Sequence, residues 1–373
     1  MDFIDRERET KRLKKALHSD RSELIVIYGR RRMGKSELIK RVIGQQDIYY
    51  EADTNEPQIQ IDLLTRDISR IYPELDGASF NSWDSIFISF NRLCVKNTTL
   101  VLDEFPYLVK RTPALPSIIQ RLVDSGTLRF NLILCGSSQR MIQNMILNSS
   151  EPLYGRATEK INLGPVGVRH WRDYFNLPSV EAIREFSVWG GVPRYWVLRE
   201  RYDSLSEAMD ELALDSDGLL FNEPAALFMD EFSDIAPYAS IMTALGNGIN
   251  RFSKIADAVG RKTSDLTQPL QNLQSMHYLC REVPYGDDDN KSKRSLYHLS
   301  DPFISFYYRF IAPNKSLLAL GRTGIVKGDI DRHLPELTSF TWESMCREAV
   351  AGNSLCGHEW GCLLYTSPSP RDA

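Results

Sequence analysis

Two glycines, a lysine and a serine stand at a spacing that suits a bound phosphate group. They belong to the string Gly29, Arg30, Arg31, Arg32, Met33, Gly34, Lys35 and Ser36. An apolar run, Leu24 to Tyr28, precedes this string, and an amphipathic stretch follows it. Glycines let backbone N–H groups curl round an anion, and a helix N-terminus adds positive potential. The pattern predicts a phosphate-binding loop in which Lys35 neutralises phosphate oxygens and Ser36 holds Mg²⁺.

A pair of carboxylates closes the apolar run that begins at Thr99. Asp103 is expected to bind the Mg²⁺ shell, and Glu104 to orient or deprotonate an attacking water. Alone, two carboxylates at a strand end are a moderate signal. Together with the upstream loop they predict binding and hydrolysis of ATP, with ATP and Mg²⁺ as the ligands.

Small polar residues follow the next apolar run, Leu132 to Cys135. If that strand lies between the two described above, Ser137 or Ser138 is placed to hydrogen-bond the γ-phosphate or the lytic water. The alternative for Ser138 is a helix N-cap. Further on, Arg156 is a candidate cation for transition-state charge, acting in its own or a neighbouring subunit. The alternative for Arg156 is a solvated loop arginine.

Short apolar runs alternate with amphipathic stretches over the first 165 residues, which is typical of a parallel sheet flanked by helices. The expected strands are 24–28, 48–51, 100–102, 132–135 and 160–163. The expected helices are 35–43, 59–71, 83–93, 115–123 and 139–147. The predicted fold class is therefore α/β, with a P-loop NTPase sheet of the ASCE/AAA-like kind.

The rest of the chain predicts helical units. Residues 166–234 are expected to form a helical lid, with a break at Gly190–Pro193. Residues 235–311 suggest a winged helix, from helices at 235–245, 252–259 and 265–279 and short strands at 280–283 and 295–299. DNA contact would use the helix from Thr263 to Leu279. The residues available for it are Arg261, Lys262, Arg281, Lys291, Lys293, Arg294, Gln268, Gln271 and Gln274. The alternative is an intramolecular structural role.

Composition narrows the class of protein. Of the 373 residues, 42% are hydrophobic and 25% charged, and the formal net charge is -4. These values indicate a globular protein rather than a wholly basic nucleic-acid coat. The charged N-terminus lacks the apolar core of a secretory signal, no apolar run suits a bilayer span, and the six cysteines form no Cys-x-x-Cys pair. We therefore expect a cytoplasmic location and no membrane partner.

As an ordered set, the motifs resemble the STAND-class P-loop ATPases, specifically the archaeal-type ATPase branch. The matching segments are 3–9, 28–36, 102–106, 135–138, 152–156 and 190–195. The resemblance implies that Arg6 and Glu7 lie near the adenine and that Pro193 is the nucleotide-sensing proline of a helical lid. Taken alone, Arg6 and Glu7 are a charged helix start, and Pro193 is a helix-breaking turn. The resemblance also implies a conformational switch that is controlled by ATP. It further implies that copies of the protein can assemble into a homo-oligomer.

The C-terminal residues carry a separate prediction. Residues 362–372 match the translation of a transposase sequencing adapter, so we expect 362–373 to be non-native. This removes Cys362 from a zinc pattern with Cys346, Cys356 and His358. The resembled family continues into a nuclease-like domain, of which 312–361 would be a truncated start and Glu343 the first matching residue. A stub from Lys315 onward is expected to pack poorly.

Three functions follow from these patterns. The leading prediction is an ATPase core at 1–165 that acts as a conformational switch with slow, Mg²⁺-dependent hydrolysis. The alternatives are a nucleotide-gated DNA-binding regulator and the ATPase module of a defence-type nuclease effector.

Overall fold

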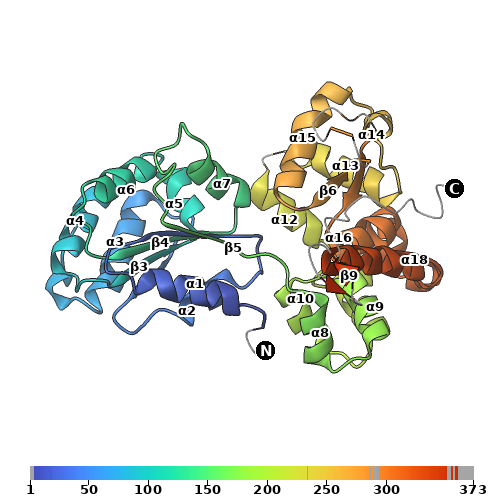
Figure 1. The fold of residues 1–373 in the computed structure, drawn as a ribbon, viewed down its shortest axis with the longest axis horizontal. Helices are drawn as coiled ribbons and strands as arrows, with labels where there is room; N and C mark the ends of the chain where they lie inside the picture. Colours follow the sequence, from blue (N-terminus) through green and yellow to red (C-terminus); the bar gives the residue numbers. More distant parts are fainter. Residues whose placement is uncertain are drawn as a thin grey trace. The chain divides into compact units, whose positions relative to one another are not determined.

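A computed structural model describes residues 4–232, 234–284, 287–288, 292, 294–350, 354–355 and 358–359. The chain divides into two compact units, Met1–Gly164 and Pro165–Ala373, which are described separately below (Figure 1). Several residues used in the sequence predictions lie outside the described ones: Phe3, Lys291, Lys293, Cys356 and the segment 362–372. Within the described residues, no helix combines the length and the apolar character that a membrane crossing requires.

The first unit is built on a five-stranded sheet in which all pairings are parallel. Its order is β2-β3-β4-β1-β5. The strands are β1 (Leu24–Tyr28), β2 (Ile48–Glu51), β3 (Thr99–Asp103), β4 (Asn131–Gly136) and β5 (Glu159–Asn162). The α/β class and the parallel sheet predicted from the alternation of apolar runs are confirmed.

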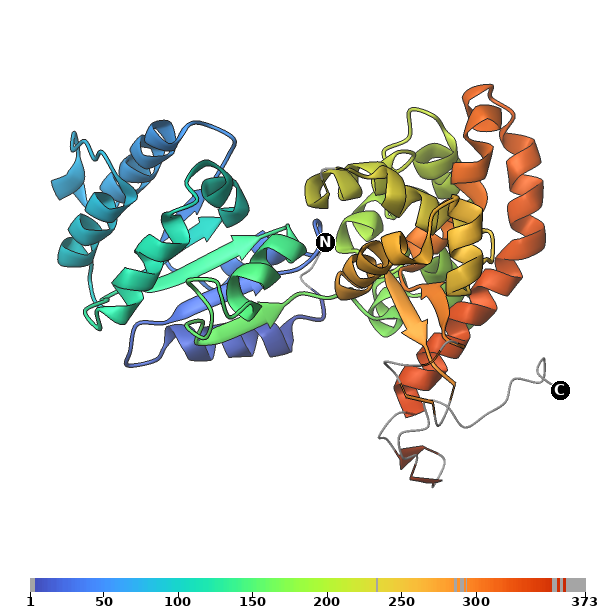
Figure 2. The same cartoon turned by 90° about the horizontal axis from the view of Figure 1, so that it is seen from above.

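Helices cover both faces of this sheet. They are α1 (Glu7–Leu17), α2 (Lys35–Lys40), α3 (Pro57–Ser69), α4 (Trp83–Leu93), α5 (Phe105–Arg111), α6 (Leu115–Asp124) and α7 (Gln139–Leu147), with a 3₁₀ turn at η1 (Pro73–Leu75). Figure 1 and Figure 2 show α1 and α2 on one side of the sheet and α3 to α6 on the other.

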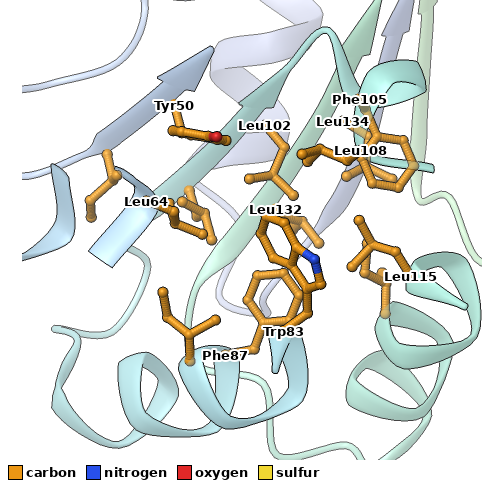
Figure 3. Packing of buried hydrophobic residues seen from close by; sticks show 14 of the residues in the cluster. Tyr50, Leu64, Trp83, Phe87, Leu102, Phe105, Leu108, Leu115, Leu132 and Leu134 are labelled. Atoms are coloured by element: carbon orange, nitrogen blue, oxygen red, sulfur yellow. The ribbon is translucent and has the colours of Figure 1, made fainter. Parts of the chain in front are cut away.

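An apolar cluster of buried side chains lies between the sheet and α3 to α7. Alternate strand residues point into it, such as Leu102 from β3 and Leu132 and Leu134 from β4 (Figure 3). Trp83 and Phe87 of α4 meet them from the helical side. This period of two fixes which strand residues are buried on this face, so the sheet is held in register by its core.

The predicted elements of this unit are largely confirmed. The bounds of β1, β2, α4 and α7 are as predicted, and the other strands differ by a residue at one or both ends. Helix α2 ends at Lys40 rather than at residue 43, where the chain continues as a turn. Helix α5 was missed, since seven residues that begin Phe-Pro are too short to show a helical period.

The second unit begins with helices and an aromatic core. The helical segments are α8 (Val168–Phe175), α9 (Ser179–Trp189), α10 (Pro193–Arg199), α11 (Leu205–Met209), η2 (Asp210–Leu214) and α12 (Glu223–Glu231). Trp171 and Trp196 are fully buried, with ring centroids 4.3 Å apart. A buried ion pair joins Arg199 to Glu185 at 2.6 Å, and Glu185 also accepts a hydrogen bond from Trp189. The lid boundaries proposed from the sequence stay a prediction.

Residues 236–299 follow the predicted order of helices and strands. They form α13 (Ala236–Gly246), α14 (Phe252–Val259), α15 (Thr263–Ser275) and an antiparallel pair, β6 (Leu279–Glu282) and β7 (Leu296–Leu299). Arg251 adds an isolated bridge to Leu296. Helix α15 ends four residues before the predicted Leu279, because His277 takes a left-handed conformation with φ 57°.

The expectation that residues from Lys315 onward pack poorly is wrong for most of this segment. After α16 (Pro302–Phe306), η3 (Tyr307–Ile311), η4 (Ala312–Asn314) and α17 (Lys315–Ala319), the chain forms α18 (Thr323–Val350), followed by the short strands β8 (Ser354–Leu355) and β9 (His358–Glu359). Helix α18 buries an apolar stripe at Val326, Ile330, Leu334 and Leu337. This stripe has the spacing of one helix face, so α18 packs on the unit without a sheet partner. Glu343 pairs with Arg347 at 2.5 Å, and its nuclease-like role stays a prediction.

Candidate active site

Three neighbouring strands carry the candidate site residues. Strand β4 lies between β1 and β3, which is the condition under which a role for Ser137 was predicted. Because the strands are parallel, their C-terminal ends share one edge of the sheet, where open α/β sheets bind ligands. That edge holds the Gly29–Ser36 loop after β1, Asp103 and Glu104 at the end of β3, and Ser137 after β4.

The loop from Gly29 to Gly34 has the backbone shape of an anion cradle. Gly29 and Gly34 have φ of 149° and 87°, and Arg32 also has a positive φ of 69°. Conformations of this kind turn successive N–H groups inward, at a cost that is smallest for glycine. The side chain of Lys35 is buried and donates to the carbonyls of Gly29 at 2.8 Å and Arg30 at 3.1 Å. The ammonium group therefore lies inside the loop.

Asp103 is buried, and both of its oxygens accept hydrogen bonds. Ser36 Oγ donates to Oδ2 at 2.7 Å, and the Tyr49 hydroxyl donates to the same oxygen. The backbone N–H of Glu104 donates to Oδ1 at 2.9 Å. Ser36 and Asp103 thus bring an alcohol and a carboxylate together. Such hard oxygen donors suit Mg²⁺.

The surroundings of Asp103 keep it ionised. Burial opposes its charge, but hydrogen bonds from Tyr49, Cys135 and Ser36 outweigh that cost and hold the pKa of Asp103 below its ordinary value. Burial and the bond to Asp103 raise the pKa of the Tyr49 hydroxyl, which stays protonated and able to donate. Burial likewise raises the pKa of the Cys135 thiol well above its usual range.

Glu104 and Ser137 are joined directly. Ser137 donates to Glu104 Oε2 from its hydroxyl at 2.9 Å and from its backbone N–H at 3.2 Å. Glu104 itself has left-handed backbone angles, φ 52° and ψ 39°, which are uncommon for a residue with a side chain. Strain of this kind is found often at functional sites. Ser138 stands at the N-cap position of α7, the alternative foreseen for it, but its side chain makes no capping hydrogen bond to that helix.

Arg156 does not lie with these residues. It precedes the N-terminal end of β5, whereas the loop and the carboxylates follow C-terminal ends of strands. Its guanidinium donates two hydrogen bonds to Asp124, at 2.8 and 2.9 Å, and one to the carbonyl of Pro152. A role for Arg156 in its own subunit is therefore corrected, and action toward a neighbouring subunit stays a prediction.

The residues assigned by resemblance are placed as follows. Arg6 is buried and donates to the carbonyls of Met33 at 3.2 Å and Gly164 at 2.7 Å, so it ties the N-terminus to the phosphate-binding loop. Glu7 is exposed in the first turn of α1. Pro193 begins α10 in the second unit. The nucleotide contacts proposed for Arg6, Glu7 and Pro193 stay predictions.

Two residues beside Asp103 were not singled out in the sequence. Tyr49 lies in a predicted strand, and Cys135 ends another and begins the matching segment 135–138, but neither residue was assigned a role from the sequence. Their contact with Asp103 depends on the order of strands in the sheet, and one sequence does not give that order. The local signal for Tyr49 was an aromatic hydroxyl within a short predicted strand.

Comparisons with known proteins agree with this geometry. Residues 3–177 match a family described as an ATPase domain predominantly from Archaea. The chain is 32% identical over 352 residues to the uncharacterized protein MJECL04 of Methanocaldococcus jannaschii, an alignment that covers 93% of this chain and 76% of the relative.

Two solved structures share the fold. The Walker-type ATPase paby2304 of Pyrococcus abyssi aligns with a TM-score of 0.61 at 23% identity, over 83% of this chain and 96% of the other. The ORC2 protein of Aeropyrum pernix, solved in ADPNP-ADP complexes, aligns with a TM-score of 0.53 at 14% identity, over 86% and 96%. The sheet is thus that of a P-loop ATPase. Through residues 3–177, this chain belongs to the ATPase family found predominantly in Archaea.

Proposed function

We propose that this protein binds ATP together with Mg²⁺, hydrolyses it slowly, and uses the bound nucleotide to switch between two conformations. One observation carries the proposal. The ends of β1, β3 and β4 bring a phosphate-binding loop, a serine–aspartate pair and a serine–glutamate pair to one edge of the sheet. Each pair unites residues more than thirty positions apart in the chain.

Nucleotide binding is assigned to the Gly29–Ser36 loop. Its N–H groups and the N-terminus of α2 supply positive potential for the β-phosphate. Lys35 is held by two loop carbonyls. Exchange of these neutral carbonyls for phosphate oxygens is favourable, because a phosphate oxygen carries negative charge and attracts the ammonium group by charge as well as by hydrogen bonding.

Hydrolysis is assigned to the two pairs. Ser36 and Asp103 would hold Mg²⁺, which neutralises phosphate charge when bound. Glu104 would orient and deprotonate the attacking water, and Ser137 positions the Glu104 carboxylate through two hydrogen bonds. Proton abstraction by a positioned carboxylate contributes roughly a hundredfold or more to a rate.

The switch is supported by the contacts of the same groups. The Lys35 ammonium is bonded to two carbonyls of its own loop. Binding of a triphosphate would exchange these partners for phosphate oxygens and so change the loop. By resemblance, Arg6 and Glu7 would sense the adenine and Pro193 the nucleotide state of the lid.

The test compares four proteins in ATP-binding and steady-state hydrolysis assays: wild type, Lys35→Ala, Glu104→Gln and Glu51→Gln. Lys35→Ala should lose binding and turnover, and Glu104→Gln should bind ATP but hydrolyse it about a hundredfold more slowly. Glu51 ends the adjacent strand β2 and is exposed, which makes it the matched control. Equal hydrolysis by all four proteins would remove the catalytic assignment.

For residues 235–311 we propose a winged helix with a structural role inside the chain. The helices, the antiparallel pair and the bridge at Arg251 support it. DNA contact through α15 is less well supported. Gln268, Gln271 and Gln274 are exposed, but α15 contains no basic residue and Arg294 is paired with Asp287. We also propose homo-oligomerisation in which Arg156, which is paired with Asp124, acts toward a neighbouring copy; the alternative for Arg156 is that of a loop arginine.

A further inference from the structure

Tyr49 lies beside the proposed metal site without belonging to its motifs. It is in β2, the edge strand next to β3, where it pairs with Val101. Its side chain is half-buried, and its hydroxyl donates to Asp103. The following residue, Tyr50, is buried in the large apolar cluster on the other face of the sheet. Of these two neighbouring phenols, only that of Tyr49 reaches the carboxylate.

Helix α2 holds both the carboxylate and the tyrosine. Near its start, Ser36 donates to Asp103 Oδ2 at 2.7 Å. At its end, the Lys40 ammonium lies 4.8 Å from the centre of the Tyr49 ring. A cation over an aromatic face is attracted to it, so Lys40 restrains the ring from one side. The tyrosine is therefore fixed between the strand and the helix that carries Ser36.

We propose that Tyr49 is the positioning residue for the metal-binding carboxylate of Asp103, an inference that rests on the proposed function. Two donors meet at Oδ2, Ser36 and Tyr49. Ser36 is itself a proposed ligand, so Tyr49 is the donor that lies outside the ligand set. A hydrogen bond of this kind fixes the rotation of a carboxylate and directs its remaining lone pairs toward the cation. Removing the bond leaves every ligand oxygen in place and the Glu104 N–H still on Oδ1, but it loosens Oδ2, the oxygen that Ser36 and Tyr49 share.

The experiment compares Tyr49→Phe with Tyr50→Phe. Both changes remove one phenolic oxygen from β2 and keep the ring. Tyr50 donates to Gln60 at 3.0 Å, away from Asp103, so its variant controls for loss of a buried hydroxyl. Binding of a fluorescent ATP analogue is followed while MgCl₂ is added to metal-free protein, and hydrolysis is measured over the same titration.

Tyr49→Phe should need about tenfold more Mg²⁺ for the half-maximal response, which is the usual loss when a donor behind a metal ligand is removed. Binding of the analogue without metal, and turnover at saturating Mg²⁺, should stay within about twofold of wild type, because the ligand oxygens are unchanged. Tyr50→Phe should give the wild-type titration.

Three results would contradict this inference, and each can be told apart from the others. A Tyr49→Phe titration that coincides with that of wild type would overturn the role of Tyr49 and leave the proposed function intact. Equal loss of binding with and without metal would show that Tyr49 only supports the fold, and would also overturn it. If ATP-analogue binding and turnover of the wild-type protein did not depend on Mg²⁺, the proposed function would be overturned, and this inference with it.

Discussion

Asp103 shows how a buried charge is kept in this site. It is 2% exposed, yet its carboxylate accepts hydrogen bonds from two hydroxyls and a backbone N–H group. A buried carboxylate without such donors would take up a proton, because desolvation disfavours the charged form. The donors therefore preserve the charge that a cation requires. The same arrangement makes the site sensitive to the loss of one oxygen atom.

Cys94 provides a test of burial through pH. It caps α4 and is 1% exposed, and burial raises the pKa of its thiol to about 11. In the unfolded chain the thiol ionises at a lower pH, about 8.5. Its contribution to stability is therefore complete below about pH 8.5 and is lost as the pH rises toward the folded pKa.

The measurement is urea unfolding of wild type and Cys94→Ala across this range of pH. The difference in free energy of unfolding between the two proteins should shrink steadily as the pH rises, since only wild type has this thiol to ionise. The other cysteines are common to both proteins and cancel. A difference that stays constant up to the folded pKa would show that the thiol is not desolvated.

The residue types of the candidate site could be predicted from the sequence, but their contacts could not. Lys35, Ser36, Asp103 and Glu104 stand in strings whose chemistry is local. The bond between Ser137 and Glu104 and the contact of Tyr49 with Asp103 depend on the sheet order. The sequence does not show at which end of the sheet Arg156 lies. Its partner Asp124 is 32 residues away in the chain, so that pairing could not be predicted either.

At the scale of elements, the phosphate-binding loop is fastened to the segment after β5. The N–H of Leu163 donates to the carbonyl of Tyr28 at 2.8 Å, just before the loop begins. Arg6 joins the carbonyl of Met33, near the end of the loop, to that of Gly164. The loop is thus held at both ends by residues that close the first unit.

Gly29 is the position where this packing is tightest. A Cβ atom there would lie 2.5 Å from the carbonyl oxygen of Leu163, and φ is already 149°. Gly29→Ala should therefore lower the free energy of unfolding by about 3 kcal/mol, from backbone strain and overlap together. It should also weaken ATP binding, because the loop must shift to relieve the overlap.

Gly155→Ala is the matched control. Gly155 also has a positive φ, 71°, but nothing lies within 4 Å of its added Cβ. It should cost only about 1 kcal/mol and leave ATP binding unchanged. Thermal unfolding and nucleotide titration of both variants make the comparison. Equal losses in the two proteins would mean that contact with Leu163 does not limit the loop.

Some of the helices and strands could be predicted from the sequence, and others could not. Strands and long helices of the first unit were predicted because their periods of two and 3.6 are imposed by burial. Strand order was not, since pairing between distant segments leaves no local pattern. The end of α15 was missed because a histidine, His277, adopts the conformation usually left to glycine. The packing of α18 was misjudged because a helix of 28 residues is long enough to bury an apolar stripe on the unit without a sheet to pack against.

At the scale of the whole molecule, each unit has its own core. The first unit is built round the cluster between the sheet and α3 to α7. The second buries Trp171, Trp189 and Trp196, together with the Glu185–Arg199 pair. All residues assigned to phosphate, metal and water belong to the first unit. Nucleotide should therefore stabilise one unit directly, and affect the other only through coupling between them.

Calorimetry of the intact chain should show two transitions, of which ATP with Mg²⁺ moves one. A ligand present at about 100 times its Kd adds about 2.7 kcal/mol to the unit that binds it. Trp83 is the one tryptophan among residues 1–164, so fluorescence of Trp83→Phe reports on the second unit alone. The unfolding temperature from that fluorescence should not change when nucleotide is added. The calorimetric transition of the first unit should shift to higher temperature, and Lys35→Ala should abolish this shift. A single transition that moves as a whole would instead mean that the two units unfold together, and that nucleotide binding is coupled to the entire chain.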